Sequence, residues 1–97
     1  MAKREIEWSP QASINLVEIL EFYRLRNGNA SYSRKLLNEI DKSVRNIQKH
    51  NYIGKLTDED SVRVVIQGNY EIFYSLNDTF RILHIWDSRQ NPAHLSV

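Results

Sequence analysis

The sequence contains no cysteine, only three histidines and no long apolar run. Without cysteine there is no disulfide framework, no thiolate metal site and no cysteine nucleophile. The histidines are scattered and lack the close spacing of a zinc-binding pair, so we expect no metal and no cofactor. No stretch reaches the ~18 consecutive apolar residues of a membrane span, and no apolar run follows the basic start. We therefore predict a cytoplasmic protein with neither a signal peptide nor a membrane segment.

The chain also lacks an excess of charge of either sign. Its 13 lysines and arginines face 12 aspartates and glutamates, for a formal net charge of +1. Such a balance provides no large field to attract nucleic acid, so any basic patch must arise from local arrangement. With 97 residues, 41% of them hydrophobic, and no repeat, low-complexity stretch or linker, we expect a single domain spanning residues 1–97.

The first half of the chain predicts a short strand followed by two helices. Residues 3–8 contain two apolar positions at a spacing of two, which favours a strand. Ser9 is suited to cap a helix and Pro10 to begin one, and Gly28 is suited to end it. This helix has apolar residues on more than one side, which indicates that the sheet covers one side and a second helix or another chain covers another. Its main apolar stripe comprises Ala12, Leu16, Ile19, Leu20 and Tyr23, and Ile14, Val17, Phe22 and Leu25 lie off that stripe.

The second predicted helix spans residues 30–50 and is clearly amphipathic. A loop of a few residues joins it to the first, so the two should form an antiparallel hairpin. Residues 51–60 lack periodicity and contain a glycine and three carboxylates, which favours an exposed connection from the helices to the sheet. The apolar positions of this second helix are Tyr32, Leu36, Ile40, Val44 and Ile47.

Residues 61–92 are the organising stretch of the chain and predict a three-stranded antiparallel meander. Two clusters of turn-forming residues, at 67–69 and 77–78, divide runs rich in β-branched and aromatic residues. The last run is apolar on both faces in its middle, so it should be an interior strand. The predicted fold class is therefore α+β with the order β-α-α-β-β-β: an antiparallel sheet of about four strands with the helical hairpin on one face.

The meander displays the polar residues that could form a site. Strict alternation puts His84 on one face of the last strand with Ile82 and Trp86, and Asp87 on the other. Each candidate has a structural alternative: His84 as a half-buried core residue, Asp87 as a salt-bridge partner of its neighbour, and the tyrosines as packing residues. No role is assigned to His50 or His94. The candidates are Arg63, Tyr70, Arg81, His84, Asp87 and Arg89.

Nearly the whole chain resembles the RelE/ParE superfamily of bacterial type II toxins, which are encoded beside an antitoxin. The resemblance rests on four segments in a fixed order, of which Gly68-Asn69-Tyr70 leading to Phe73-Tyr74 is the most specific. It implies a plasmid-stabilisation type of toxin that inhibits growth until its antitoxin binds. The four segments are IEWSPQA, the charged second helix ending near Gly54, VRVVIQGNYEIFY and RILHIWDSRQNP.

The resemblance implies two mechanisms, since RelE-like members cut messenger RNA in the ribosome and ParE-like members poison DNA gyrase. A nuclease needs a proton acceptor and cations for the phosphate. The resemblance places basic residues on the central strands, where Arg63 and Arg89 would be the cations. His84 would be the base, because a histidine is the only ready general base on the sheet. Asp87, Tyr70 and Arg81 would contact the substrate or target. Glu71, however, occupies a position that is commonly arginine in the family, and a carboxylate there cannot bind phosphate. The chain also lacks the paired aromatic and basic residues that cleaving members carry after the last strand.

Three hypotheses therefore stand: a toxin whose target is gyrase or is undetermined, a ribosome-dependent messenger RNA endoribonuclease, and an inactive relic that only binds antitoxin. All three predict an antitoxin partner, and with it a toxin–antitoxin hetero-oligomer. The wide apolar surface of the first helix and the sheet face opposite the hairpin predict its binding groove. An amphipathic helix with an extended tail would fit there, by helix-in-groove binding or strand addition.

Overall fold

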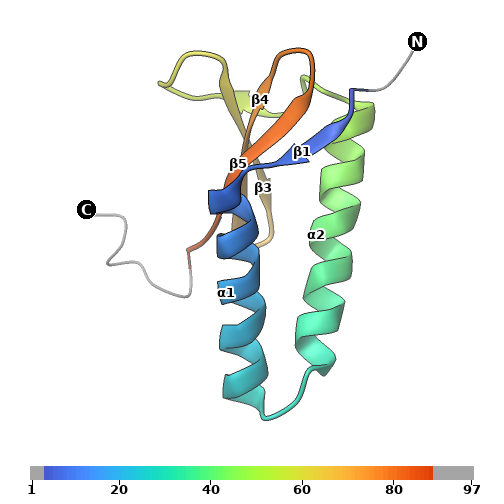
Figure 1. Cartoon of the computed structure of the whole chain (residues 1–97), viewed down its shortest axis with the longest axis vertical. Helices are drawn as coiled ribbons and strands as arrows, with labels where there is room; N and C mark the ends of the chain where they lie inside the picture. Colours follow the sequence, from blue (N-terminus) through green and yellow to red (C-terminus); the bar gives the residue numbers. More distant parts are fainter. Residues whose placement is uncertain (1–3, 89–97) are drawn as a thin grey trace.

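The computed structural model describes residues 4–88, which form two helices and a five-stranded sheet (Figure 1). The predicted α+β class and the helical hairpin are confirmed. The expectation that residues 51–60 contain no regular element is wrong, because a two-residue strand forms there. The elements in chain order are β1 (Ile6–Trp8), α1 (Pro10–Asn27), α2 (Ser31–Lys49), β2 (Lys55–Leu56), β3 (Val62–Gln67), β4 (Tyr70–Leu76) and β5 (Phe80–Asp87).

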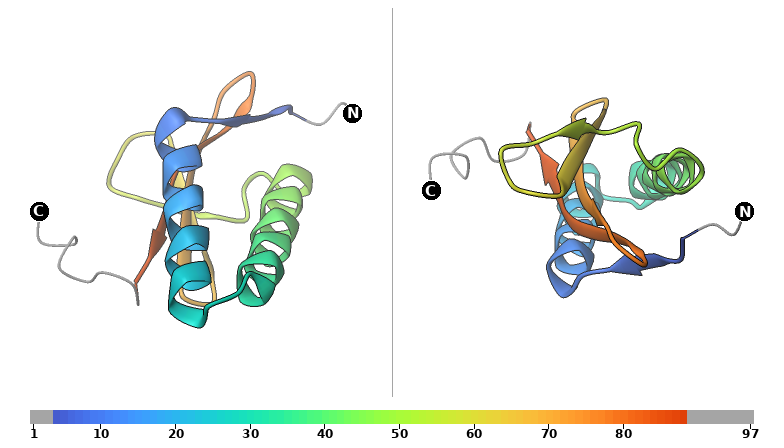
Figure 2. Two further views of the ribbon diagram at one scale, coloured as in Figure 1. Left: turned by 60° about the horizontal axis from the view of Figure 1, so that its bottom comes forward. Right: turned by 90° about the horizontal axis from the view of Figure 1, so that it is seen from above.

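The strand order is β1-β5-β4-β3-β2, with β1 and β2 at opposite edges (Figure 2, right). The expected meander of β3, β4 and β5 is antiparallel throughout, and β5 is an interior strand as predicted. β1 pairs with β5 in parallel, so the sheet is mixed. Parallel pairing is possible because the helical hairpin forms the long connection that such a pair requires.

The first helix begins and ends at the residues that the sequence indicates. Ser9 accepts a hydrogen bond on Oγ from the amide of Ala12 at 3.0 Å, and Pro10 opens the helix. Gly28 ends it in the left-handed conformation, φ 74°, and donates its amide to the carbonyl of Arg24. These contacts satisfy backbone groups that a helix leaves without partners at its ends.

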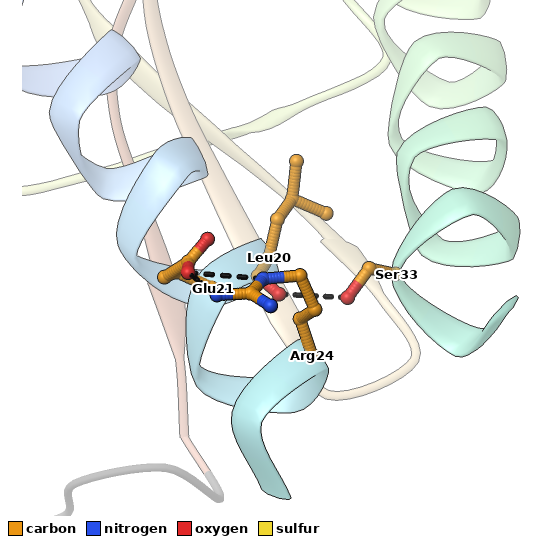
Figure 3. Close-up of polar contacts among 4 residues, drawn as sticks. All are labelled: Leu20, Glu21, Arg24 and Ser33. Atoms are coloured by element: carbon orange, nitrogen blue, oxygen red, sulfur yellow. Dashed lines mark hydrogen bonds and ion pairs between the residues drawn. The ribbon is translucent and has the colours of Figure 1, made fainter. Parts of the chain in front are cut away.

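The two helices run side by side in opposite directions (Figure 1). A hydrogen bond between them runs from the hydroxyl of Ser33 to the carbonyl of Leu20 at 2.7 Å, beside an ion pair of Glu21 and Arg24 on α1 (Figure 3). The helices and one face of the sheet enclose the core. Its buried apolar residues are Ala12, Ile19, Tyr23, Leu36, Ile40, Val44, Ile47, Tyr70, Ile72, Tyr74, Phe80, Ile82 and Ile85.

A β-bulge in β5 changes which side chains face the helices. Tyr74 pairs with Ile82 and Phe73 pairs with His84, so Leu83 has no partner on β4. Side chains at the cap of α1 and along α1 form hydrogen bonds with backbone groups at the bulge. The hydroxyl of Ser9 donates to the carbonyl of Leu83 at 2.7 Å.

Beyond the bulge, the side-chain amide oxygen of Asn15 accepts the amide of Ile85 at 3.2 Å. Because one residue is added, the alternation of β5 reverses after Leu83. Ile85 and Asp87 are buried toward the helices, as Ile82 is. The expectation that His84 shares a face with Ile82 is therefore wrong.

Candidate functional site

The two faces of the sheet divide the residues that the sequence singles out. Side chains of directly paired residues in an antiparallel ladder point to the same face. Arg63 pairs with Tyr74, and Tyr74 is buried in the core under the helices. His84 pairs with Phe73, which points the other way. We call the face that carries Phe73 and His84 the open face. One predicted cation of the nuclease, Arg63, and its predicted base, His84, thus lie on opposite faces.

Arg63 holds a turn in place. Its Nη1 donates to the carbonyls of Gly54 at 2.7 Å and Tyr52 at 3.4 Å. Its guanidinium also lies over the ring of Tyr52, 5.0 Å from the centroid. From the core side, the hydroxyl of Tyr74 donates to the carbonyl of Asn51 at 2.8 Å and accepts the amide of Gly54 at 2.9 Å. Arg63 and Tyr74 together fix the path of the chain from α2 to β2.

Tyr70 and Asp87 lie together at the other end of the core, with two tyrosines from the helices. The hydroxyl of Tyr23 donates to Oδ2 of Asp87 at 3.0 Å, and Tyr23 stacks edge-on against Tyr32. Burial raises the pKa of Tyr70 well above its ordinary value, and the charge of Asp87 and a hydrogen bond with Tyr32 raise it further. Tyr70 is therefore a neutral phenol at physiological pH and cannot act as a base.

His84 lies on the open face against the ring of Phe73, with the ring centroids 4.2 Å apart. Burial lowers the pKa of His84, and the carboxylates of Glu59 and Glu71 only partly oppose this effect. The imidazole is therefore neutral near pH 7 and can accept a proton. The two negative charges beside it nevertheless repel a phosphate, so this part of the sheet is poorly suited to a phosphodiester.

Arg81 lies on the open face beside β1, where its Nη1 forms an ion pair of 2.7 Å with Glu7. Arg89 lies outside the described residues, and its predicted role stays a prediction. Within residues 4–88, therefore, the structure brings Tyr70 and Asp87 together on one face and His84 and Arg81 onto the other, with Arg63 apart from both pairs.

Two arrangements could not be found from the sequence alone. The contact of Tyr23 with Asp87 joins residues 64 positions apart, and Tyr23 has the spacing of an ordinary core residue. The second is an open cleft at the end of α2, lined in part by Lys49, His50 and Tyr52. Its only signal in the sequence is a short run that mixes basic and aromatic residues.

Over residues 4–88, no three histidine, aspartate or glutamate side chains gather where they could hold a metal ion. Neither helix in this part of the chain has the length and apolar character needed to cross a membrane.

Comparison with known proteins decides the family. Residues 6–92 match the family model described as the ParE toxin of the type II toxin–antitoxin system parDE. The chain belongs to this ParE toxin family. The match covers both helices and all five strands. Because members of the family act in a toxin–antitoxin pair, the chain is the toxin component of a type II system and has an antitoxin as its partner.

Solved structures agree with the ParE fold. A chain of the chromosomal ParDE system from P. aeruginosa superposes with a TM-score of 0.75 at 18% sequence identity. The alignment covers 86% of this chain and 94% of the other. At this identity the likeness establishes the arrangement of helices and strands only. A search of curated protein sequences gives no match.

Proposed function

We propose that this ParE-family toxin arrests growth, when free of its antitoxin, by inhibiting DNA gyrase. The observation that carries the proposal is the match to the ParE toxin over residues 6–92, which spans every element of the fold. In this view the toxin is an inhibitor that binds its target and performs no chemistry of its own. Exposed side chains outside the core then bind the target.

The distribution of polar residues supports an inhibitor over a nuclease. Cleavage by a ribose 2′-oxygen needs a base and phosphate-binding cations around one phosphodiester. Arg63 and His84 lie on opposite faces of the sheet, and the fork of Arg63 is bonded to two carbonyls. Glu71, in place of the arginine common in the superfamily, adds a negative charge beside His84.

The target can be tested by producing the toxin alone in cells. We expect growth arrest, induction of the DNA-damage response, and loss of plasmid supercoiling by purified gyrase when purified toxin is added. Primer extension on messenger RNA should show no new ends. Intact supercoiling together with codon-periodic cleavage would instead support the endoribonuclease, and harmless overproduction would support the relic.

The antitoxin has two complementary surfaces on this fold. Ile14, Val17 and Leu25 are exposed on α1 and lie on a common side, since their spacings of three and eight residues are close to whole turns. They form an apolar stripe that neither the sheet nor α2 covers, which suits an amphipathic helix.

The second surface is the outer edge of β3. β2 pairs only with Arg63 and Val64, so the remaining half of β3, from Val65 to Gln67, has no neighbouring strand on that side among residues 4–88. An extended segment could add there by main-chain hydrogen bonds. We propose that the antitoxin contacts both surfaces, with a helix on α1 and an extended tail at β3.

Co-purification tests this arrangement. Val17→Glu places a charge in the centre of the apolar stripe and should abolish co-elution with the product of the neighbouring reading frame. Leu37→Glu is the control, because Leu37 is also an exposed apolar residue but lies on α2. Equal loss of co-elution in both variants, or in neither, would contradict the assignment to α1.

A further inference from the structure

The end of α2 and the turn that follows it form an open cleft of about 740 Å³. Its walls come from two parts of the chain that are far apart in sequence: the segment before β1 and the link from α2 to β2. A volume in this range is typical of ligand-binding clefts. The lining residues are Arg4, Lys49, His50, Asn51, Tyr52 and Ile53.

The cleft is basic, although the chain as a whole is nearly neutral. Arg4 and Lys49 are cationic, and none of the six lining residues is acidic. The formal net charge of the whole chain is only +1, so this concentration of positive charge is a local arrangement. A concave site with one sign of charge attracts ligands of the opposite sign.

One of the cationic groups, Arg4, is held in position. Nε of Arg4 donates to the carbonyl of Asn77 at 2.9 Å, and Nη1 donates to the side-chain oxygen of Asn51. The backbone carbonyl of Arg4 accepts a hydrogen bond from the side-chain amide Nε2 of Gln48 at 2.8 Å. Since a guanidinium has five N–H donors, these two side-chain bonds orient it and leave further donors for a ligand.

Tyr52 supplies a fixed aromatic surface beside these cations. Its side chain is 66% exposed, and Arg63 lies over one face of the ring at 5.0 Å from the centroid. The two hydrogen bonds of the Tyr74 hydroxyl to Asn51 and Gly54 hold the turn on either side of Tyr52. The ring is therefore largely open to solvent on a turn of fixed path, where a planar group can stack on it.

Three backbone amides of the turn are used within the fold and therefore contribute little to anion binding. The amides of His50, Ile53 and Gly54 donate to Asn46, to His50 and to the hydroxyl of Tyr74. A compact phosphate nest needs free backbone amides. Attraction must instead come from separate side chains, which suits an extended polyanion with several phosphates better than one small anion.

The negative end of the α2 dipole does not prevent binding of an anion at this cleft. The side-chain amide of Asn51 donates to the carbonyls of Ile47 at 2.9 Å and Gln48 at 3.0 Å. These bonds occupy carbonyls that would otherwise face an approaching anion.

We propose that this cleft binds single-stranded nucleic acid: a base stacks on Tyr52, and the adjoining phosphates contact Arg4 and Lys49. Proteins that bind single strands combine a basic groove with aromatic rings in this way. The site goes beyond the proposed toxin function, because neither the antitoxin surfaces on α1 and β3 nor inhibition of gyrase requires it.

Fluorescence anisotropy with the purified full chain and a fluorescein-labelled oligothymidylate of about ten nucleotides tests the proposal. Binding should weaken as salt rises. Lys49→Ala should weaken it further and make the slope of log affinity against log salt shallower by about 1, as expected for one lost phosphate contact. Tyr52→Ala should weaken binding by about five- to 150-fold with the salt slope unchanged, the range measured for stacked bases.

Lys35→Ala is the matched control, because it removes the same charge from the same helix. Lys35 lies 14 positions before Lys49, or about 21 Å along the axis, and outside the cleft. It should leave both affinity and salt slope unchanged. Equal effects of the two lysine variants, or no binding at low salt, would overturn the proposal. So would a poly-glutamate peptide that competes fully while Tyr52→Ala has no effect, since the cleft would then be a site for acidic protein segments.

Discussion

The two faces of the sheet differ in how they use polar residues. On the face under the helices, Tyr74 and Asp87 are buried and bonded to groups of other elements: Tyr74 to the turn at residues 51–54, Asp87 to Tyr23. On the open face, His84 and Arg81 are only partly covered, and their neighbours include Glu59, Glu71 and Glu7. Polar residues of the first face therefore serve the fold, whereas those of the second can change with little structural cost.

A matched pair of isoleucine substitutions gives the largest test of this difference. Ile72 on β4 points toward the helices and is 0% exposed, whereas Ile66 on β3 is 70% exposed. Ile72→Ala should lower the free energy of unfolding by about 2–5 kcal/mol, because it leaves a cavity in a closed core. Ile66→Ala should change it by no more than about 0.5 kcal/mol. Urea denaturation of both variants measures the difference, and similar losses would contradict the assignment of faces.

Removal of one hydroxyl tests whether the covered face depends on its polar bonds. Tyr74→Phe leaves the amide of Gly54 and the carbonyl of Asn51 without their partner. We expect a loss of about 1–3 kcal/mol in the free energy of unfolding, the usual cost of leaving buried polar groups unsatisfied. Tyr52→Phe is the control, since Tyr52 is exposed, and should be nearly neutral. A neutral Tyr74→Phe would show that water replaces the hydroxyl.

Much of the fold follows from local signals in the sequence. Ser9 and Pro10 mark the start of α1 and Gly28 marks its end, because caps depend on few residues and a short range. The apolar period of α2 predicts its buried side as observed. A two-residue strand such as β2 has no period to detect, so the sequence predicts only a loop there.

The candidate site was less predictable, because it depends on the bulge at Leu83. Nothing in the run from Phe80 to Asp87 indicates where an extra residue enters β5. The bulge is stabilised from outside the strand, by the side chains of Ser9 and Asn15 on the segment leading into and along α1. Alternation counted along the strand therefore assigns His84 and Asp87 to the wrong faces, and the grouping of Tyr70 with Asp87 appears only in three dimensions.

Acidification tests the environment of His84. Burial against Phe73 lowers the pKa of His84 below its value in the unfolded chain. The unfolded state therefore binds a proton first as pH falls through about 6.5, and folding stability decreases from there until the folded-state pKa is passed. His84→Gln should remove this part of the pH dependence. Denaturation midpoints compared between pH 7.5 and pH 5.5 measure it, and an identical slope in both proteins would show that His84 is fully solvated.

The smallest expected effect is the coupling free energy of the ion pair between Glu7 and Arg81. It tests whether another chain covers the open face. Both side chains are about half exposed, at 51% and 40%. A double-mutant cycle with Glu7→Gln and Arg81→Gln should give a coupling of about 0.2–1 kcal/mol, and added salt should reduce it. A larger coupling that resists salt would mean that the pair is shielded from water in solution. Since no element of residues 4–88 provides such a cover, the shield would have to be a second chain, and the open face would then be an interface.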